Sequence, residues 1–272
     1  AEALRAEYHS DMLRAGFVKM FMDGVIDSRT AYMLDDYPGA PGERGAPLFS
    51  PAQFDAICIE ADRRGLQIAV HAIGDGAVRQ TINGYEAALR ANGRADARHR
   101  IEHIELIDRA DVPRLGALGI TASVQPPHPP GVMDFPLEPT MTVGFAPHRR
   151  RDAYLWKTLK DHGAPVAYAS DWPVTDVSVM RGLQGALTRQ PYDGAADERL
   201  GLMESLHAYT AGGAWAAHLE DLCGSLRPGL GGDLVVIDGD IEAIPAERLG
   251  QTGIALTICA GKVTHDGGVL AL

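Results

Sequence analysis

The chain has 272 residues, 46% of them hydrophobic and 22% charged, a composition that excludes the disordered class and predicts one large folded domain or slightly more. The formal net charge is −11, which disfavours nucleic acid and anionic membranes as partners because both carry negative phosphates. Three widely separated cysteines argue against a disulfide framework and a cysteine zinc site, and no apolar run reaches the roughly 20 residues that span a bilayer.

Short β-branched runs alternate with helical stretches along the chain, which is typical of an α/β fold with parallel strands. The predicted strands are residues 17–21, 66–70, 100–104, 120–124 and 165–169. The predicted helices lie between Ser50 and Gly65 and at residues 77–91, 111–118, 154–162, 179–189 and 203–218. Ser50 is predicted to cap the first of these helices, with Gln53 completing a capping box. Five strand–helix units with two open edges fit either a doubly wound sheet or five-eighths of a (β/α)₈ barrel.

Two segments depart from this alternation. Residues 125–151 form a long, proline-rich loop, for which a functional role or disorder is expected, and the arginines at 149–151 are interpreted as solvated. After about Gly224 the sequence changes to glycine turns and β-runs at 234–237 and 255–259, which indicates part of a separate small β-domain. We therefore expect two domains, residues 1–223 and 224–272.

Polar side chains stand at the carboxyl ends of the predicted strands, where parallel α/β folds bind ligands. In chain order these are Lys19 with Asp23, His71, His103, Gln125 and Asp171. Imidazole nitrogens and carboxylate oxygens without thiolates suit a divalent metal, and zinc is the first expectation.

Each of these residues also has a structural interpretation. A single strand-end histidine is more often a hydrogen-bonded rim residue than a ligand, and Asp171 could simply cap the following turn. Lys19 lies in an apolar strand, where a buried ion pair with Asp23 or another carboxylate would be the alternative to modification. We assign no metal to the other histidines; His128, which could contact substrate, is expected to be a solvated loop residue.

A series of motifs covers nearly everything from Gly16 to Val263. The motifs are Val18–Gly24 (VKMFMDG), Asp27–Ala31 (DSRTA), Val70–Asp75 (VHAIGD), His99–His103 (HRIEH), Ser123–Pro126 (SVQP), Ser170–Asp171, Ala208–Thr210 (AYT) and Gly224–Gly229 (GSLRPG) with Gly232–Asp233. In content and order they resemble the amidohydrolase superfamily, specifically the amidohydrolase 3 group of metal-dependent hydrolases.

The resemblance implies a distorted (β/α)₈ TIM barrel, with strands four to eight in residues 1–223, and part of a small β-sandwich in residues 224–272. It implies that His71 and His103 are metal ligands, that Asp171 contacts metal and moves protons, and that Lys19 takes the place of a lysine that many members carboxylate to bridge two metals. One or two divalent ions, most simply zinc, are implied. The group's first-strand HxH is absent from the sequence, so we expect the C-terminal half of a longer protein whose partner is its own N-terminal half.

The function expected from this resemblance is metal-dependent hydrolysis of an amide-type C–N bond, in an amide, an N-formyl compound or a cyclic amide. Asp171 would be the general base for a metal-activated water, and Arg29, Gln125 and Trp172 would contact substrate, with surface packing as the alternative for each. We expect activity to need the HxH segment. Alternatives are an inactive half-barrel scaffold that binds metal weakly, or an ester or phosphoester hydrolase. We further expect a small-molecule substrate and no nucleic acid or membrane partner. A homodimer is an open option, and a cytoplasmic location is expected.

Overall fold

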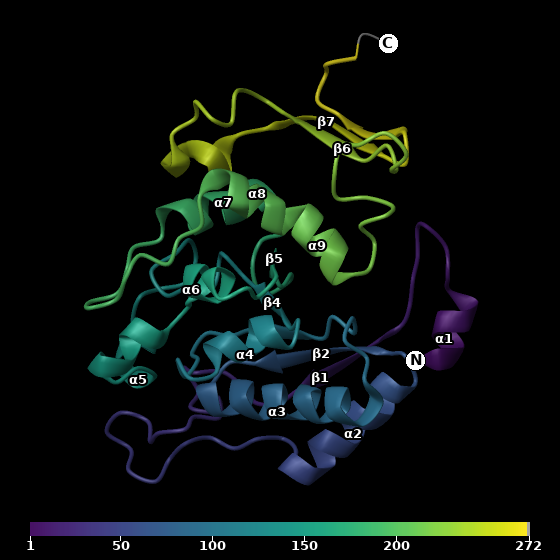
Figure 1. Ribbon diagram of the computed structural model, residues 1–272. Coiled ribbons are helices and arrows are strands. Elements are labelled where there is room, and N and C mark those ends of the chain that lie inside the picture. The colour runs from purple at the N-terminus through teal and green to yellow at the C-terminus, as the bar shows by residue number, and fades with distance from the viewer. Residues whose placement is uncertain (271–272) are drawn as a thin grey trace.

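A five-stranded parallel sheet organises the first part of the computed structural model, which describes residues 1–270 (Figure 1). Its strands, in spatial order, are β1 (Phe17–Phe21), β2 (Gln67–Ala72), β3 (Arg100–His103), β4 (Thr121–Val124) and β5 (Val166–Tyr168). Every neighbouring pair is parallel, so all carboxyl ends meet at one edge. The predicted α/β fold with parallel strands is confirmed.

The spatial order of the strands equals their order in the chain. A doubly wound sheet reverses its strand order at a switch point, and this sheet contains no reversal among the described residues, so that alternative is excluded. Sequential parallel strands are what consecutive units of a (β/α)₈ barrel contain. The barrel itself stays a prediction.

Helices connect and cover the strands close to the predicted positions. They are α1 (Glu2–Glu7), α2 (Pro51–Arg63), α3 (Asp75–Asn92), α4 (Val112–Ala117), α5 (Thr140–Val143), α6 (Trp156–Asp161), α7 (Val179–Thr188), α8 (Leu202–Tyr209) and α9 (Ala211–Ala216), with 3₁₀ turns η1 (Pro147–Asp152) and η2 (Ala246–Gln251). The capping box of α2 is present, because the Gln53 backbone N–H donates to Ser50 Oγ at 3.4 Å and the Ser50 backbone N–H donates to Gln53 Oε1 at 3.0 Å. The helix predicted over 203–218 is instead two helices, because Thr210 leaves helical geometry (φ −117°, ψ −93°).

Burial differs sharply between the central strands and β1. All residues of β2 and β4 are buried, whereas β1 alternates, with Phe17, Lys19 and Phe21 exposed and Val18 and Met20 half-buried. β1 pairs only with β2 among the described residues, so its other edge is unpaired, and the face that carries Phe17, Lys19 and Phe21 is left uncovered by residues 1–270. The expectation of a buried Lys19 is therefore wrong, and no carboxylate of residues 1–270 pairs with its ammonium.

The proline-rich segment packs onto the molecule through ion pairs. Arg149, in η1, donates to Asp75 Oδ2 at 2.6 Å, to Asp35 Oδ2 at 2.8 Å and to Asp152 Oδ2 at 3.2 Å. Its side chain is only 14% exposed, and that of Asp75 is fully buried. The interpretation of 149–151 as solvated is thus wrong for Arg149, because three carboxylates from separate segments converge on it.

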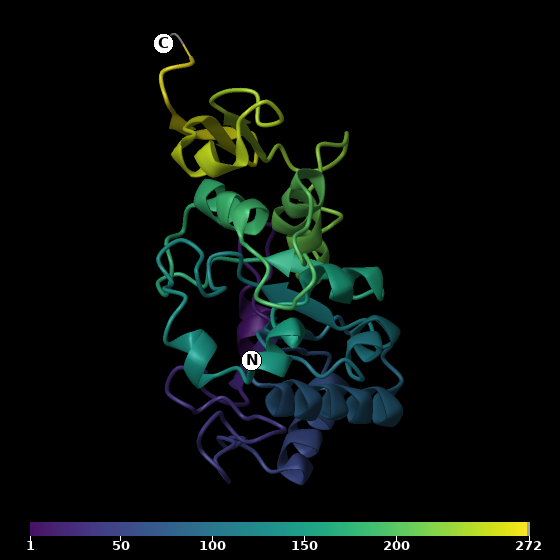
Figure 2. The ribbon, with the colours of Figure 1, turned by 90° about the vertical axis from the view of Figure 1, so that its left-hand side faces the viewer.

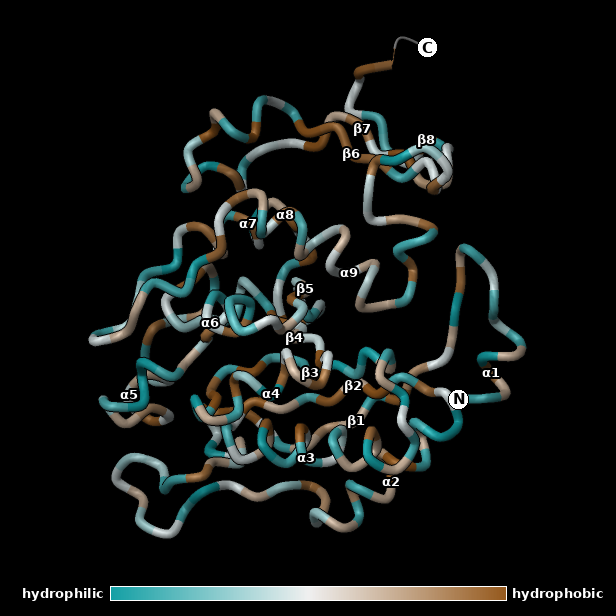
Figure 3. Tube along the Cα trace, in the orientation of Figure 1, coloured by the Kyte–Doolittle hydropathy of each residue, from teal (hydrophilic) through white to brown (hydrophobic). Residues whose placement is uncertain are grey.

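A second, antiparallel sheet follows, with order β6-β7-β8: β6 (Leu234–Ile237), β7 (Ile254–Cys259) and β8 (Lys262–Asp266). Figures 1 and 2 place it at the opposite end of the molecule from α2 and α3, and Figure 3 shows hydrophobic stretches along β6 and β7. Leu249 in η2 packs with Met180 and Leu183 of α7, which joins this sheet to the rest. The domain boundary at 224 and the β-sandwich stay predictions.

Helix length and polarity also bear on membranes. Across residues 1–270, each helix is either too short or too polar to serve as a bilayer-spanning segment.

Candidate metal and substrate site

A cavity of about 360 Å³ opens at the carboxyl ends of the parallel strands. This volume lies in the range of small-molecule sites. The cavity is lined by Lys19, Phe21, Val25, Ile26, Asp27, His71, Ile73, His103, Glu105, His128, Pro130, Phe135, Thr140, Tyr154, Asp171 and Val174. Four residues singled out in the sequence, Lys19, His71, His103 and Asp171, therefore share one cavity.

His71 and His103 come from adjacent strands. His103 pairs in register with Ala72, the residue after His71, and the two imidazole rings lie edge to face with centroids 4.5 Å apart. His71 Nε2 donates to the Gly24 carbonyl at 2.9 Å, which leaves its Nδ1 as the lone-pair nitrogen. A backbone carbonyl that orients an imidazole in this way is typical of metal-ligating histidines.

Burial favours the neutral form of both imidazoles, the form that metal ligation requires. Desolvation lowers the pKa of His71, opposed by its hydrogen bond to Gly24, and desolvation lowers the pKa of His103 well below its usual value. His103 is 5% exposed, and its Nδ1 is shielded from solvent without a hydrogen-bond partner in residues 1–270. A buried imidazole nitrogen without a partner is costly unless a ligand completes it.

Backbone strain coincides with two of these residues. His103 and Asp171 both have left-handed backbone angles, with φ of 82° and 58°. Such conformations cost of order 1–3 kcal/mol in residues other than glycine and cluster at functional sites. Both side chains, His103 at the end of β3 and Asp171 after β5, line the same cavity.

The Asp171 side chain is 40% exposed, and its Oδ2 lies 3.8 Å from His128 Nε2. Partial burial raises the pKa of Asp171, while the positive charge of Lys19 opposes the shift. Lys19 extends over the Phe21 ring at 5.2 Å, and desolvation by its neighbours lowers the pKa of the Lys19 ammonium. The two groups therefore influence each other's protonation across the cavity.

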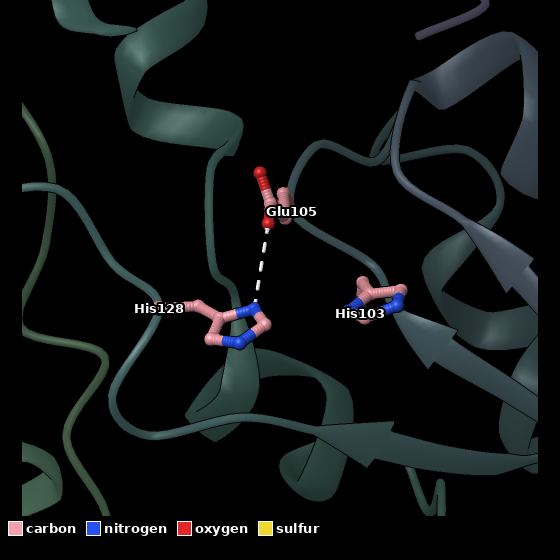
Figure 4. A group of neighbouring side chains, drawn as sticks. All are labelled: His103, Glu105 and His128. Atoms are coloured by element: carbon pink, nitrogen blue, oxygen red, sulfur yellow. Dashed lines mark ion pairs between the residues drawn. The ribbon is translucent and has the colours of Figure 1, made fainter. Parts of the chain in front are cut away.

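Glu105 and His128 were not assigned to the site by sequence reasoning, yet both line the cavity (Figure 4). The expectation that His128 is solvated is wrong: it is 8% exposed, because it stacks between His103 at 5.6 Å and Phe135 at 5.3 Å. Burial raises the pKa of Glu105 to about 8 and lowers that of His128 to about 4. The signal for Glu105 was its place two residues after His103; His128 had no comparable signal.

Three potential ligands, His103, Glu105 and His128, have donor atoms that all lie within 4.8 Å of one another. They are the one such group among residues 1–270. His71 and Asp171 line the same cavity outside that group. Imidazole nitrogens together with carboxylate oxygens suit a borderline divalent cation such as zinc, so the residues present fit a metal ion. The ligand roles of His71, His103, Asp171 and Lys19 stay predictions.

Three predicted substrate contacts lie outside the cavity lining described for residues 1–270. Arg29 is exposed and donates to Glu43 Oε2 at 3.4 Å, and Trp172 is 68% exposed. Gln125 is buried and donates to the Ser123 carbonyl at 3.2 Å. Asp23 has a structural role, because it accepts backbone N–H groups of Tyr32, Ile73 and Gly74 at 2.9–3.0 Å.

Comparisons with known proteins give a consistent result. Residues 2–265 match the model of the amidohydrolase family. The chain is 35% identical over 232 residues to "Protein LONG AFTER FAR-RED 3" of Arabidopsis thaliana, covering 84% of this chain and 39% of that protein. It is 26% identical over 272 residues to N-substituted formamide deformylase of Arthrobacter pascens, covering 96% of this chain and 47% of that enzyme.

The fold has solved counterparts as well. A crystal structure of an uncharacterized metal-dependent hydrolase from Pyrococcus furiosus superposes with a TM-score of 0.69 at 28% identity, covering 82% of this chain and 44% of that chain. The chain thus spans less than half the length of each of these three proteins.

Proposed function

The chain belongs to the amidohydrolase family, and from this premise we propose that it acts in metal-dependent hydrolysis of an amide-type C–N bond. The observation that carries the proposal is the convergence of Lys19, His71, His103 and Asp171 on one cavity at the carboxyl ends of the strands. The likeness to N-substituted formamide deformylase supports an amide, N-formyl or cyclic amide substrate.

In this proposal His71, His103 and Asp171 hold a divalent cation, with zinc the simplest choice and one or two ions per site. The cation would supply Lewis acidity and make water a stronger nucleophile near neutral pH. Lys19 would bridge a second ion if its amine is carboxylated. Its lowered pKa favours the neutral amine that carboxylation requires.

Asp171 would move the proton. Its carboxylate accepts a proton from the attacking water and passes it to the leaving nitrogen, so that the C–N bond breaks with release of a neutral amine. The burial that raises the Asp171 pKa brings the carboxyl nearer the working pH, where a general base also becomes a useful acid. The same carboxylate therefore serves both halves of the reaction.

We propose that the whole protein supplies the rest of the site. A further segment of the same protein would contribute the HxH pair and the remaining barrel strands, because the chain spans less than half the length of the relatives named above. We also propose that Arg29, Gln125 and Trp172 contact the substrate. The proposal includes a homodimer and a cytoplasmic location. The substrate is a small molecule, and the net charge of −11 disfavours nucleic acid and membrane partners.

The experiment is to assay zinc-loaded protein on N-formyl amines, simple amides and cyclic amides by release of the amine. Asp171→Asn should lower kcat by about 10²–10⁴-fold, the usual contribution of a general base, while circular dichroism shows an unchanged fold. Asp176→Asn is the matched control, because Asp176 is also 40% exposed but pairs with Arg181 instead of lining the cavity.

Three outcomes would contradict the proposal. Full turnover in Asp171→Asn would remove the proposed base. Cleavage of esters or phosphoesters, but of no amide, would favour the other hydrolase chemistry. Metal binding without any turnover, in the protein together with its N-terminal half, would favour a non-enzymatic scaffold.

A further inference from the structure

We propose that His103, Glu105 and His128 form a cation site of their own, which this chain completes without ligands from elsewhere. The site shares His103 with the catalytic set proposed above but does not need hydrolysis, so it goes beyond the proposed function. Two of its members, Glu105 and His128, have no part in that set. Figure 4 shows the three side chains facing a common space between β3 and the proline-rich segment.

The distances suit an ion with little rearrangement. The three donor atoms lie within 4.8 Å of one another, so an ion placed between them could lie no farther than about 2.8 Å from any of them. Zinc–nitrogen and zinc–oxygen bonds are about 2.0–2.2 Å long. An inward movement of about 0.7 Å by each side chain would therefore complete the site.

Hydrogen bonds among the three side chains do not account for the cluster, although Glu105 has a hydrogen-bond partner outside it in Tyr154. Glu105 Oε1 and His128 Nδ1 are 3.9 Å apart, beyond hydrogen-bond distance, and His128 Nε2 is 3.8 Å from Asp171 Oδ2. His103 Nδ1 and His128 Nε2 are shielded from solvent and have no hydrogen-bond partner within residues 1–270. Leaving such groups unpaired is unfavourable, which points to a ligand that the cluster is built to take.

The charge around the cluster favours a cation over an anion or a neutral ligand. Glu105 is largely buried, with 12% of its side chain exposed, and no Lys or Arg among residues 1–270 forms an ion pair with it. Burial disfavours the ionised Glu105 carboxylate, and a cation beside it would stabilise that form in a region that water solvates poorly.

The ligand set also selects the kind of cation. Two imidazoles and one carboxylate match zinc and neighbouring transition metals, whereas calcium and magnesium prefer oxygen ligands. Three protein ligands would leave a position open toward the cavity. Because His128 lies in the loop 125–151 and His103 ends β3, the ion would tie that loop to the sheet.

The test measures metal binding rather than turnover. Chelator-treated protein is titrated with ZnCl₂ by calorimetry, and zinc content is checked by mass spectrometry. Glu105→Gln and His128→Gln should each weaken zinc binding by at least about tenfold. His148→Gln is the matched control, since His148 is an exposed histidine of the same loop, and its affinity should equal that of the unmodified protein.

Hydrogen exchange of the unmodified protein, with and without zinc, supplies a second readout. Zinc should slow amide exchange in residues 125–135, and Glu105→Gln should abolish that slowing. Unchanged affinity in both Glu105→Gln and His128→Gln, or no zinc effect on exchange in this segment, would overturn the inference.

The outcomes also separate this site from the proposed function. If His71→Asn and Asp171→Asn weaken zinc binding while Glu105→Gln and His128→Gln do not, the inference fails and the proposed function stands. If Glu105→Gln and His128→Gln weaken binding but Asp171→Asn keeps full hydrolysis, the inference stands and the proposed general base is wrong.

Discussion

Replacing Arg149 with methionine should reveal how strongly ion pairs hold the loop that carries His128. The guanidinium contacts three carboxylates, but they differ in value. The Asp35 side chain is 69% exposed, and an exposed pair of this kind contributes about 0–1 kcal/mol. Asp75 is fully buried, and removing the partner of a buried charge costs about 3–5 kcal/mol. Because Asp75, at the start of α3, still accepts the backbone N–H groups of Leu34 and Gly76, we expect the lower end, about 3 kcal/mol.

The assay is urea unfolding followed by circular dichroism, with the change in midpoint converted through a common m value. Arg150→Met is the matched control, because Arg150 loses only a hydrogen bond to the Met141 carbonyl at 3.2 Å and a pair with the fully exposed Asp193 at 4.0 Å. That variant should lose no more than about 1 kcal/mol. Adding Asp75→Asn to Arg149→Met should restore part of the loss, because it removes the unpaired buried charge. Equal losses for Arg149→Met and Arg150→Met would refute the reasoning.

Three further predictions concern other parts of the molecule. The Asp62 carboxylate is buried and accepts hydrogen bonds from Arg94 and Asn92 at 2.8 Å. Burial by itself would raise the pKa of Asp62. The contacts with His99, Asn92 and Arg94 lower that pKa by more, so it lies below the usual 3.8. A carboxyl pKa that is lower in the folded state stabilises the fold above about pH 4, and this stabilisation is lost as the pH falls through the folded-state pKa. Asp62→Asn should therefore lower the free energy of unfolding by about 1.5–3 kcal/mol at pH 7. The loss should become progressively smaller in urea titrations below pH 4. Gly84→Ala should destabilise the protein by about 1–3 kcal/mol in the same assay, because the new Cβ would lie 2.5 Å from the ring of Phe54. This clash should exceed the preference of alanine for helices. A gain in stability would contradict this packing. Zinc should raise the Tm of the unmodified protein in scanning calorimetry and a chelator should reverse the rise, whereas a zinc-independent Tm would argue against any high-affinity ion in this chain.

Local patterns in the sequence were sufficient for the strands, for α2 with its cap and for the residues that end the strands. The Ser50–Gln53 capping box depends on neighbours three residues apart, and the strand-end positions of His71 and His103 depend only on where each hydrophobic run stops. Since parallel strands place their carboxyl ends together, the sequence also determined that Lys19, His71, His103 and Asp171 would share one edge.

Only the tertiary structure decided which side chains are buried beside that edge. His128 packs against His103, and Arg149 forms an ion pair with Asp75, which lies 74 residues earlier in the chain. Both contacts depend on the path of the proline-rich loop, whose sequence has no hydrophobic periodicity from which that path could be predicted. Lys19 is exposed because no segment of residues 1–270 covers its face of β1, which no feature of the strand's own sequence specifies. Burial and charge pairing are properties of distant neighbours, so they follow from packing, whereas helix caps and strand ends follow from the chain itself.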